Sequence, residues 1–151
     1  MGLTGKLIAE FEIKSSGDLF HDMFSNKPHH ISKASPHHIQ GCDLHDGEFG
    51  TPGSVILWNY KIDGKACVAK EIVEAIDVEN KSITFKVIEG DLMNDYKIFK
   101  LTIDVTPKGD TSVVKWTLEY EKLHDGVDEA LKILELAIRV TKDIEAHHLK
   151  A

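Results

Sequence analysis

The sequence predicts an α+β domain in which a curved, antiparallel sheet is covered by a single long C-terminal helix. Two observations carry this prediction. Apolar and polar residues alternate with a period of two through most of residues 54–121, and the pattern changes to a helical period after Gly126. A sheet with one apolar face and a helix with one apolar stripe bury both surfaces when the helix lies across the sheet.

The first 44 residues add a strand, two short helices and a second strand. Residues 3–13 alternate between apolar and charged side chains, which is typical of a strand. The Ser15–Asp18 stretch is suited to cap a short helix that follows it. A second short helical element is expected at 27–33, and the next strand at 39–44.

Five further strands are expected in the alternating region. They cover residues 54–62, 66–76, 83–87, 99–105 and 114–120. The turns between these strands are short and polar, and Asp63-Gly64 after the strand at 54–62 is a strong hairpin signal. Consecutive strands with such turns form an antiparallel meander, which brings the expected total to seven strands.

The C-terminal helix is predicted to span Val127–Lys150, about six turns. Acidic side chains are placed in its first turn, where the helix dipole favours negative charge. One face of the helix carries lysine, arginine and acidic residues, and the opposite face is apolar. That apolar stripe is expected to be buried, and it consists of Ala130, Ile133, Ala137, Val140 and Ile144, flanked by Leu134 and Thr141.

Length and charge limit the functions that are open to the chain. A chain of 151 residues is expected to form one domain, covering residues 1–151. Its formal net charge of −7 argues against nucleic acid or an anionic membrane as the main partner. No signal-peptide pattern and no apolar run of roughly 20 residues is present, so a cytoplasmic protein without membrane insertion is expected. The protein is expected to be a monomer or a weak dimer.

A glycine-rich stretch, GEFGTPGS at residues 47–54, raises the question of a phosphate-binding loop. A P-loop needs a lysine after its last glycine and a helix behind it, whereas here Ser54 follows and a strand continues. The alternative is a tight connection in which Gly47, Gly50 and Gly53 adopt positive φ and Pro52 stiffens the exit. We favour the connection, although it is longer than a hairpin requires.

Other chemistry-bearing motifs are not found in the sequence. Three pairs of adjacent histidines occur, but adjacent side chains diverge on a strand or a helix and do not form a chelate. The sequence contains no C-x-x-C, H-E-x-x-H or G-x-S-x-G pattern. No metal, no cofactor and no catalytic group of residues is therefore expected.

Four features of the sequence resemble those of a known family. They are the order of the elements, the glycine loop after the second strand, Glu89-Gly90 at the end of the fifth strand, and the C-terminal string VTKDIEAHHLKA. They resemble plant major latex and ripening-related proteins, a branch of the birch-pollen-allergen superfamily, over essentially the whole chain. The resemblance implies a helix-grip (START-like) fold with an internal hydrophobic cavity. It also implies binding, storage or transport of hydrophobic small molecules, such as sterols, triterpenoids, phenolics or hormones, with a part in plant defence or stress response.

Under this resemblance, apolar residues of the strands and of the inner helix stripe are expected to line the cavity, and the glycine loop to form part of its wall near the rim. Periodicity alone does not separate a hollow face from a packed one, although the small Ala130 and Ala137 favour a hollow one. The expected lining residues are Ile56, Trp58, Tyr60, Val68, Ile72, Ile83, Phe85, Val87, Phe99, Leu101, Trp116, Leu118, Tyr120, Ala130, Ile133, Leu134 and Ala137.

Two other functions are compatible with the same fold. Some relatives in the superfamily are enzymes that condense plant metabolites in the cavity, and Tyr120 and Lys70 are the residues here that such an enzyme would use. The resemblance also includes abscisic-acid sensors, but their Ser-Gly-Leu-Pro-Ala gate is replaced here by Ile62-Asp63-Gly64-Lys65. A carrier of hydrophobic molecules is the leading hypothesis.

Overall fold

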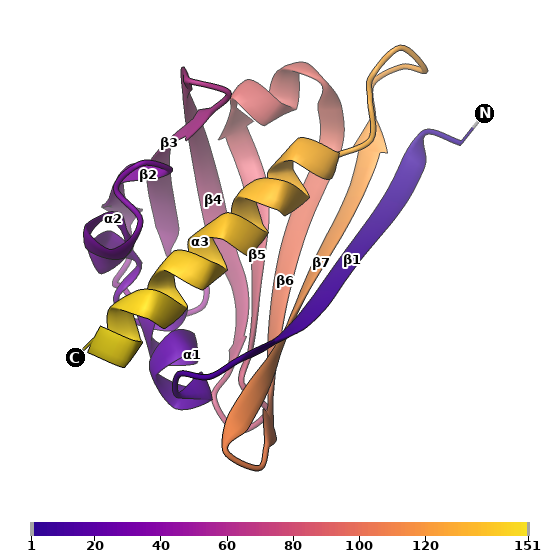
Figure 1. Cartoon of the computed structure of the whole chain (residues 1–151). Coiled ribbons are helices and arrows are strands. Elements are labelled where there is room, and N and C mark those ends of the chain that lie inside the picture. Colours follow the sequence, from indigo (N-terminus) through magenta and orange to yellow (C-terminus); the bar gives the residue numbers. More distant parts are fainter. Residues whose placement is uncertain (1, 151) are drawn as a thin grey trace.

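A computed structural model describes residues 2–150, which form a seven-stranded antiparallel sheet and a long C-terminal helix. The strand order is β1-β7-β6-β5-β4-β3-β2, so β2 to β7 form a meander and β1 pairs with β7 (Figure 1). The predicted fold class is confirmed. The strands are β1 (Thr4–Ile13), β2 (Ile39–Asp46), β3 (Val55–Ile62), β4 (Lys65–Asp77), β5 (Ser82–Gly90), β6 (Tyr96–Lys108) and β7 (Thr111–Lys122).

The helices follow the predicted order. Helix α1 (Gly17–Ser25) is capped at its N-terminus by Ser16, whose side-chain oxygen accepts a hydrogen bond from the Leu19 amide at 3.2 Å. A 3-10 turn, η1 (Pro28–His30), leads into α2 (Ile31–Ala34), and these two form the second short element expected from the sequence. A further 3-10 turn, η2 (Asp91–Asn94), joins β5 to β6.

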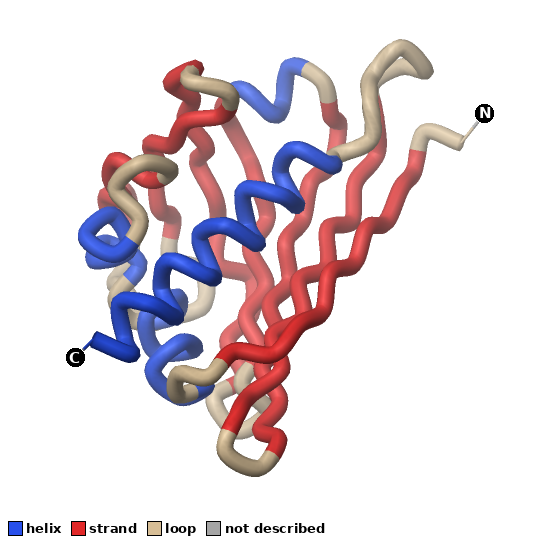
Figure 2. Tube along the Cα trace, viewed as in Figure 1, coloured by secondary structure: helices blue, strands red, loops and turns tan. Residues whose placement is uncertain are grey.

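Helix α3 (Leu131–Lys150) crosses one face of the sheet diagonally, and the short helices α1 and α2 lie beside its C-terminal half (Figures 1 and 2). The core lies between this helical layer and the sheet, and Ile13, Phe20, Phe99 and Ile144 are completely buried in it. Among residues 2–150, no helix combines the length and the apolar character needed to cross a membrane.

The predicted start of the C-terminal helix is wrong by four residues. The helix begins at Leu131 rather than Val127, and no acidic residue lies in its first turn. The side chain of Glu129 instead accepts hydrogen bonds from the Tyr120 hydroxyl and the Lys122 ammonium of β7. The carbonyl of Asp128 accepts a hydrogen bond from the Tyr96 hydroxyl at 2.9 Å. These contacts with β6 and β7 hold the preceding segment out of the helix.

Polar contacts also fasten the C-terminal half of α3. Ser35, directly after α2, donates a hydrogen bond from its hydroxyl to Asp143 at 2.6 Å. The backbone amide of Lys14, directly after β1, donates to the carboxylate of Glu145. The helix is therefore tied to the rest of the protein both before its first turn and near its end.

Candidate functional site

An apolar cavity of about 90 Å³ lies between the sheet and the N-terminal half of α3. Strands β2 to β7, η2 and all three α-helices contribute side chains to its wall, so residues distant in the sequence meet there. The lining residues are Phe24, Ile31, Ile39, Trp58, Tyr60, Ala69, Glu71, Phe85, Leu92, Leu101, Trp116, Ile133, Leu136, Ala137 and Val140.

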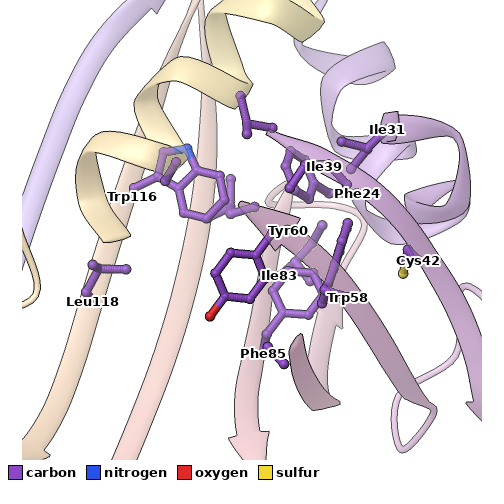
Figure 3. Packing of buried hydrophobic residues seen from close by; sticks show 14 of the residues in the cluster. Phe24, Ile31, Ile39, Cys42, Trp58, Tyr60, Ile83, Phe85, Trp116 and Leu118 are labelled. Carbon is purple, nitrogen blue, oxygen red and sulfur yellow. The ribbon is translucent and has the colours of Figure 1, made fainter. Parts of the chain in front are cut away.

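Five of the lining residues are aromatic, and all five are buried. Trp58 and Tyr60 project from β3, Phe85 projects from β5, and Trp116 lies beneath α3 (Figure 3). The ring of Phe24 meets the Trp116 ring edge-on, with centroids 5.5 Å apart. Burying an indole leaves its N–H in need of an acceptor, and each tryptophan has one.

The two indoles find acceptors of different kinds. Trp116 Nε1–H donates to the hydroxyl of Thr141 on α3 at 2.8 Å, which links the sheet to the helix. Trp58 Nε1–H donates to Oε1 of Glu71 on β4 at 2.9 Å. The Thr141 hydroxyl in turn donates a hydrogen bond to the Ala137 carbonyl at 2.8 Å, so the hydroxyl both accepts and donates.

Glu71 is the acidic residue of the cavity wall. Its side chain is buried, and burial raises the pKa of its carboxyl to about 8, against a smaller opposing effect of the hydrogen bond from Trp58. The carboxyl group is therefore mostly protonated at neutral pH. A protonated carboxyl in an apolar wall both donates and accepts hydrogen bonds.

Seven of the residues expected from the sequence line this cavity: Trp58, Tyr60, Phe85, Leu101, Trp116, Ile133 and Ala137. Others are buried in the core but are not among its lining residues: Ile56, Ile83, Val87, Phe99, Leu118, Tyr120 and Ala130. Leu134 is only partly buried. Phe99 and Tyr120 stack on each other and each meets Tyr96 edge-on, at centroid distances of 5.0–5.8 Å, in a packed cluster of rings.

The expectation that Val68 and Ile72 face the cavity is wrong. Val68 is 40% exposed, and Ile72 has the same parity along β4. Directly opposed residues of an antiparallel pair lie on the same face of the sheet, and Ala69 is opposite Trp58 while Glu71 is opposite Ile56. The inward positions of β4 are therefore Ala69 and Glu71, and Val68 and Ile72 point away.

Several lining residues were not expected from the sequence. Phe24, Ile31 and Ile39 come from the N-terminal helices and β2, and Leu92 comes from η2. Leu136 and Val140 come from α3, and the second of these was already expected on the buried stripe. Apolar character marked these positions as buried, but only their packing against α3 brings them to the cavity.

The glycine loop has the backbone expected of it, because Gly47, Gly50 and Gly53 all have φ between 81° and 90°. Neither these glycines nor Pro52 is among the lining residues, so the expected place of the loop in the cavity wall is not seen. The loop braces the N-terminal helices instead. Its Phe49 ring stacks on His29 with centroids 4.2 Å apart.

The residues considered for an enzyme are not brought together. Lys70 points away from the cavity and pairs with Glu89 at 3.1 Å. The Tyr120 hydroxyl donates to Glu129, just before α3. Within residues 2–150, no three histidine, cysteine, aspartate or glutamate side chains are grouped so that they could hold a metal ion.

A sequence model of the pathogenesis-related protein Bet v 1 family matches residues 2–151. MLP-like protein 28 of Arabidopsis thaliana is 55% identical over 149 residues, which are 97% of this chain and 44% of that protein. MLP-like protein 31 of the same plant is 52% identical over 149 residues, 97% of this chain and 87% of that protein. The chain thus spans less than half of the first relative and most of the second.

Solved structures agree with this match. The crystal structure of ginseng major latex-like protein 151 from Panax ginseng is 52% identical, with a TM-score of 0.96, and the match covers 98% of this chain and 99% of that one. A START superfamily protein from Mycobacterium smegmatis (17% identical, TM-score 0.76, 96% and 97% covered) has a similar fold. Norcoclaurine synthase from Thalictrum flavum (20% identical, TM-score 0.71, 95% and 88% covered) is alike in fold alone.

Proposed function

Because this chain belongs to the pathogenesis-related protein Bet v 1 family, among whose members major latex-like proteins match it at about half identity, we propose that it binds a compact hydrophobic molecule between the sheet and α3. The observation that carries the proposal is the cavity wall. All but one of its residues have an apolar or aromatic side chain, and Glu71 is the exception. Such a wall stabilises a bound molecule by removing its apolar surface from water, about 25 cal/mol per Å².

The cavity volume favours a compact ligand. A cavity of about 90 Å³ is smaller than the roughly 150 Å³ that holds a benzene molecule in an engineered protein. Drug-sized ligands occupy pockets of roughly 300–1,000 Å³. A sterol or triterpenoid therefore requires the wall to move apart, whereas a phenolic or hormone-like molecule with one ring needs only a small adjustment.

The proposed role is that of a carrier or store rather than a catalyst. The Lys70 and Tyr120 side chains are engaged outside the cavity, and Glu71 has no basic partner in the wall. Reversible binding needs no reacting group, only a surface that fits the ligand. The description of the family as pathogenesis-related is consistent with a part in plant defence.

The test is a titration with cyclohexanol, which is compact and does not absorb where tryptophan fluoresces. Both tryptophans of the chain line the cavity, so binding is expected to change the protein's fluorescence. For a ligand of this size, we expect a binding free energy of about −4 to −6 kcal/mol, and thus dissociation constants between about 1 mM and tens of micromolar. A sterol titrated in parallel shows whether the wall opens further.

Ala137→Phe is the matched perturbation, because Ala137 lies in the wall and the added ring takes up the space of the ligand. We expect it to abolish cyclohexanol binding while unfolding free energy changes by less than about 1 kcal/mol. The control is Ala146→Phe, on the exposed side of the same helix, which should leave binding intact. A wild type that binds nothing, together with a loss of more than about 3 kcal/mol in Ala137→Phe, would show a solid core and refute the proposal.

A further inference from the structure

We infer that the ligand is an organic ammonium ion, a protonated amine on a compact apolar body, whose nitrogen is held by the Glu71 carboxylate inside the aromatic wall. This inference rests on the proposed function, since it names the chemical class that the same cavity takes. Glu71 carries the one carboxyl group among the lining residues, and only one of its two oxygens bonds to the protein.

The carboxyl group of Glu71 is only half engaged by the protein. Trp58 Nε1–H donates to Oε1 at 2.9 Å, and within residues 2–150 the other oxygen, Oε2, makes no hydrogen bond. The residue is 7% exposed and lines the cavity. A buried polar group normally has its partners within the protein, and Oε2, on a residue of the cavity wall, keeps the capacity to bond a ligand there.

Between residues 2 and 150, no positively charged group pairs with this carboxyl. No lysine, arginine or histidine is among the residues that line the cavity. The neighbouring Lys70 is directed to the other face of the sheet, where its ammonium lies 3.1 Å from Glu89. A buried acid without a basic partner in a concave site is a candidate for a functional group. The chemistry that complements it is a cation supplied by the ligand.

The aromatic rings complement the same cation. Trp58, Tyr60, Phe85, Trp116 and Phe24 surround the cavity, and aromatic faces attract a desolvated ammonium ion through the ring quadrupole (Figure 3). An ammonium ion can donate to Oε2 while its carbon skeleton lies against the rings. A hydroxyl or carbonyl of a neutral ligand uses the hydrogen bond but gains nothing from the charge or from the rings.

Binding of such an ion moves one proton. Burial raises the pKa of Glu71 to about 8, so its carboxyl holds a proton in the empty protein at pH 7. The bound ammonium ion favours the carboxylate, and the carboxyl proton is released to the solvent while the amine keeps its own. The affinity for the ammonium ion therefore rises about tenfold per pH unit below pH 8, and it levels off above that pH.

The other titratable groups near Glu71 do not interfere in this range. Burial raises the pKa values of the Cys42 thiol on β2 and the Tyr60 hydroxyl on β3, so both stay neutral. The charge of Asp91 in η2 acts on Tyr60 and further raises its pKa. Only apolar or aromatic side chains reach the cavity wall from the three α-helices and from β5, β6 and β7.

The experiment compares benzylamine with benzyl alcohol, which differ in the group that meets Glu71. Calorimetric titrations of the wild-type protein at pH 6, 7 and 8 measure both affinities. We expect the benzylamine affinity to rise about tenfold from pH 6 to pH 7 and to exceed the benzyl alcohol affinity at least tenfold at pH 8. Titration in two buffers of different ionisation enthalpy should show about one proton released per benzylamine bound at pH 6 to 7.

Glu71→Gln removes the charge and keeps an acceptor for Trp58, so it should prefer benzyl alcohol to benzylamine and show no pH dependence. Glu89→Gln, on the exposed side of the sheet, is the control and should behave as wild type. Benzyl alcohol binding as tightly as benzylamine at every pH overturns the inference but leaves the proposed function standing. If neither compound binds, the proposed function fails, and the inference fails with it.

Discussion

Replacing Glu71 with glutamine should change how the stability of the protein depends on pH. In the native state the pKa of this carboxyl is about 8, against an ordinary value of 4.5 in the unfolded chain. Below pH 4.5 both states hold the proton. As pH rises from 4.5 toward 8, the unfolded state loses its proton while the native state retains it, so the free energy of unfolding falls. Above pH 8 both states are ionised and the fall ends.

The size of the effect follows from the interval between the two pKa values. At about 1.4 kcal/mol per pH unit, the contribution of Glu71 falls by about 3–4 kcal/mol between pH 5 and pH 8. Glutamine has no proton to lose, yet its amide oxygen can still accept the hydrogen bond of Trp58. The two proteins should therefore be about equally stable at pH 5, and the variant more stable at pH 8.

Urea unfolding of both proteins at pH 5, 6, 7 and 8 measures this difference directly, since histidines and other titrating groups affect both alike. Glu89→Gln serves as the control, because the Glu89 side chain is 67% exposed and should show no comparable change. Parallel stability curves for wild type and Glu71→Gln across this range would refute the argument. They would mean that water or a structural adjustment keeps Glu71 ionised in the native state.

Three further predictions concern packing and backbone geometry. Ile144→Ala, at a completely buried position of α3, should cost about 2–5 kcal/mol of unfolding free energy, whereas Leu149→Ala, at a position 55% exposed, should cost less than about 0.5; equal urea midpoints would contradict the assignment of the buried face. Gly50→Ala should destabilise more than Gly64→Ala, because both have positive φ but only a Cβ at Gly50 would collide with another atom, Oδ1 of Asn26; thermal unfolding that ranks them in the opposite order would argue against it. Thr141→Val should cost about 1–3 kcal/mol, because it leaves a buried indole N–H without its acceptor, and Thr141→Ser should restore most of that loss in the same unfolding assay.

The fold was predictable because most of its elements carry a local signal. The change of period after Gly126, the Asp63-Gly64 turn and the Ser16 cap each determine one boundary or connection. The start of α3 was not predictable in the same way. Acidic residues before Leu131 satisfy the rule for a helix N-terminus, but in the structure Glu129 binds side chains of β7. A contact between distant parts of the chain thus overrides a local preference.

The direction of the side chains on β4 could have been predicted, and it decides the chemistry of the cavity. A two-residue turn at Asp63-Gly64 places Ile62 opposite Lys65, and the pairing then continues to Ile56 opposite Glu71. Counting from the turn therefore directs Glu71 inward. Composition alone favours Val68 and Ile72 instead, because isoleucine and valine are more often buried than glutamate. The register gives the better prediction here.

The volume of the cavity could not be predicted from the sequence. Whether a face is hollow depends on how far apart α3 and the sheet are held, and residues such as Phe24 and Leu92 reach the wall only through that packing. The small Ala137 of α3 does lie in the wall, as expected, whereas Ala130 is buried outside it. Side-chain size along the helix is thus an incomplete guide to the position of empty space.

The fastening of α3 determines how the protein can deform. Helix α3 is held in place at two points. Just before its first turn, Glu129 binds Tyr120 and Lys122, and in its C-terminal half Asp143 binds Ser35. A helix that is fixed at two points does not move outward as a rigid body, and its largest displacement occurs midway between those points. The part of α3 midway between these two contacts, around Leu136 and Ala137, lies over the cavity. The segment that deforms most easily is therefore the one above the cavity, and small displacements there enlarge the cavity without breaking the contacts at either end.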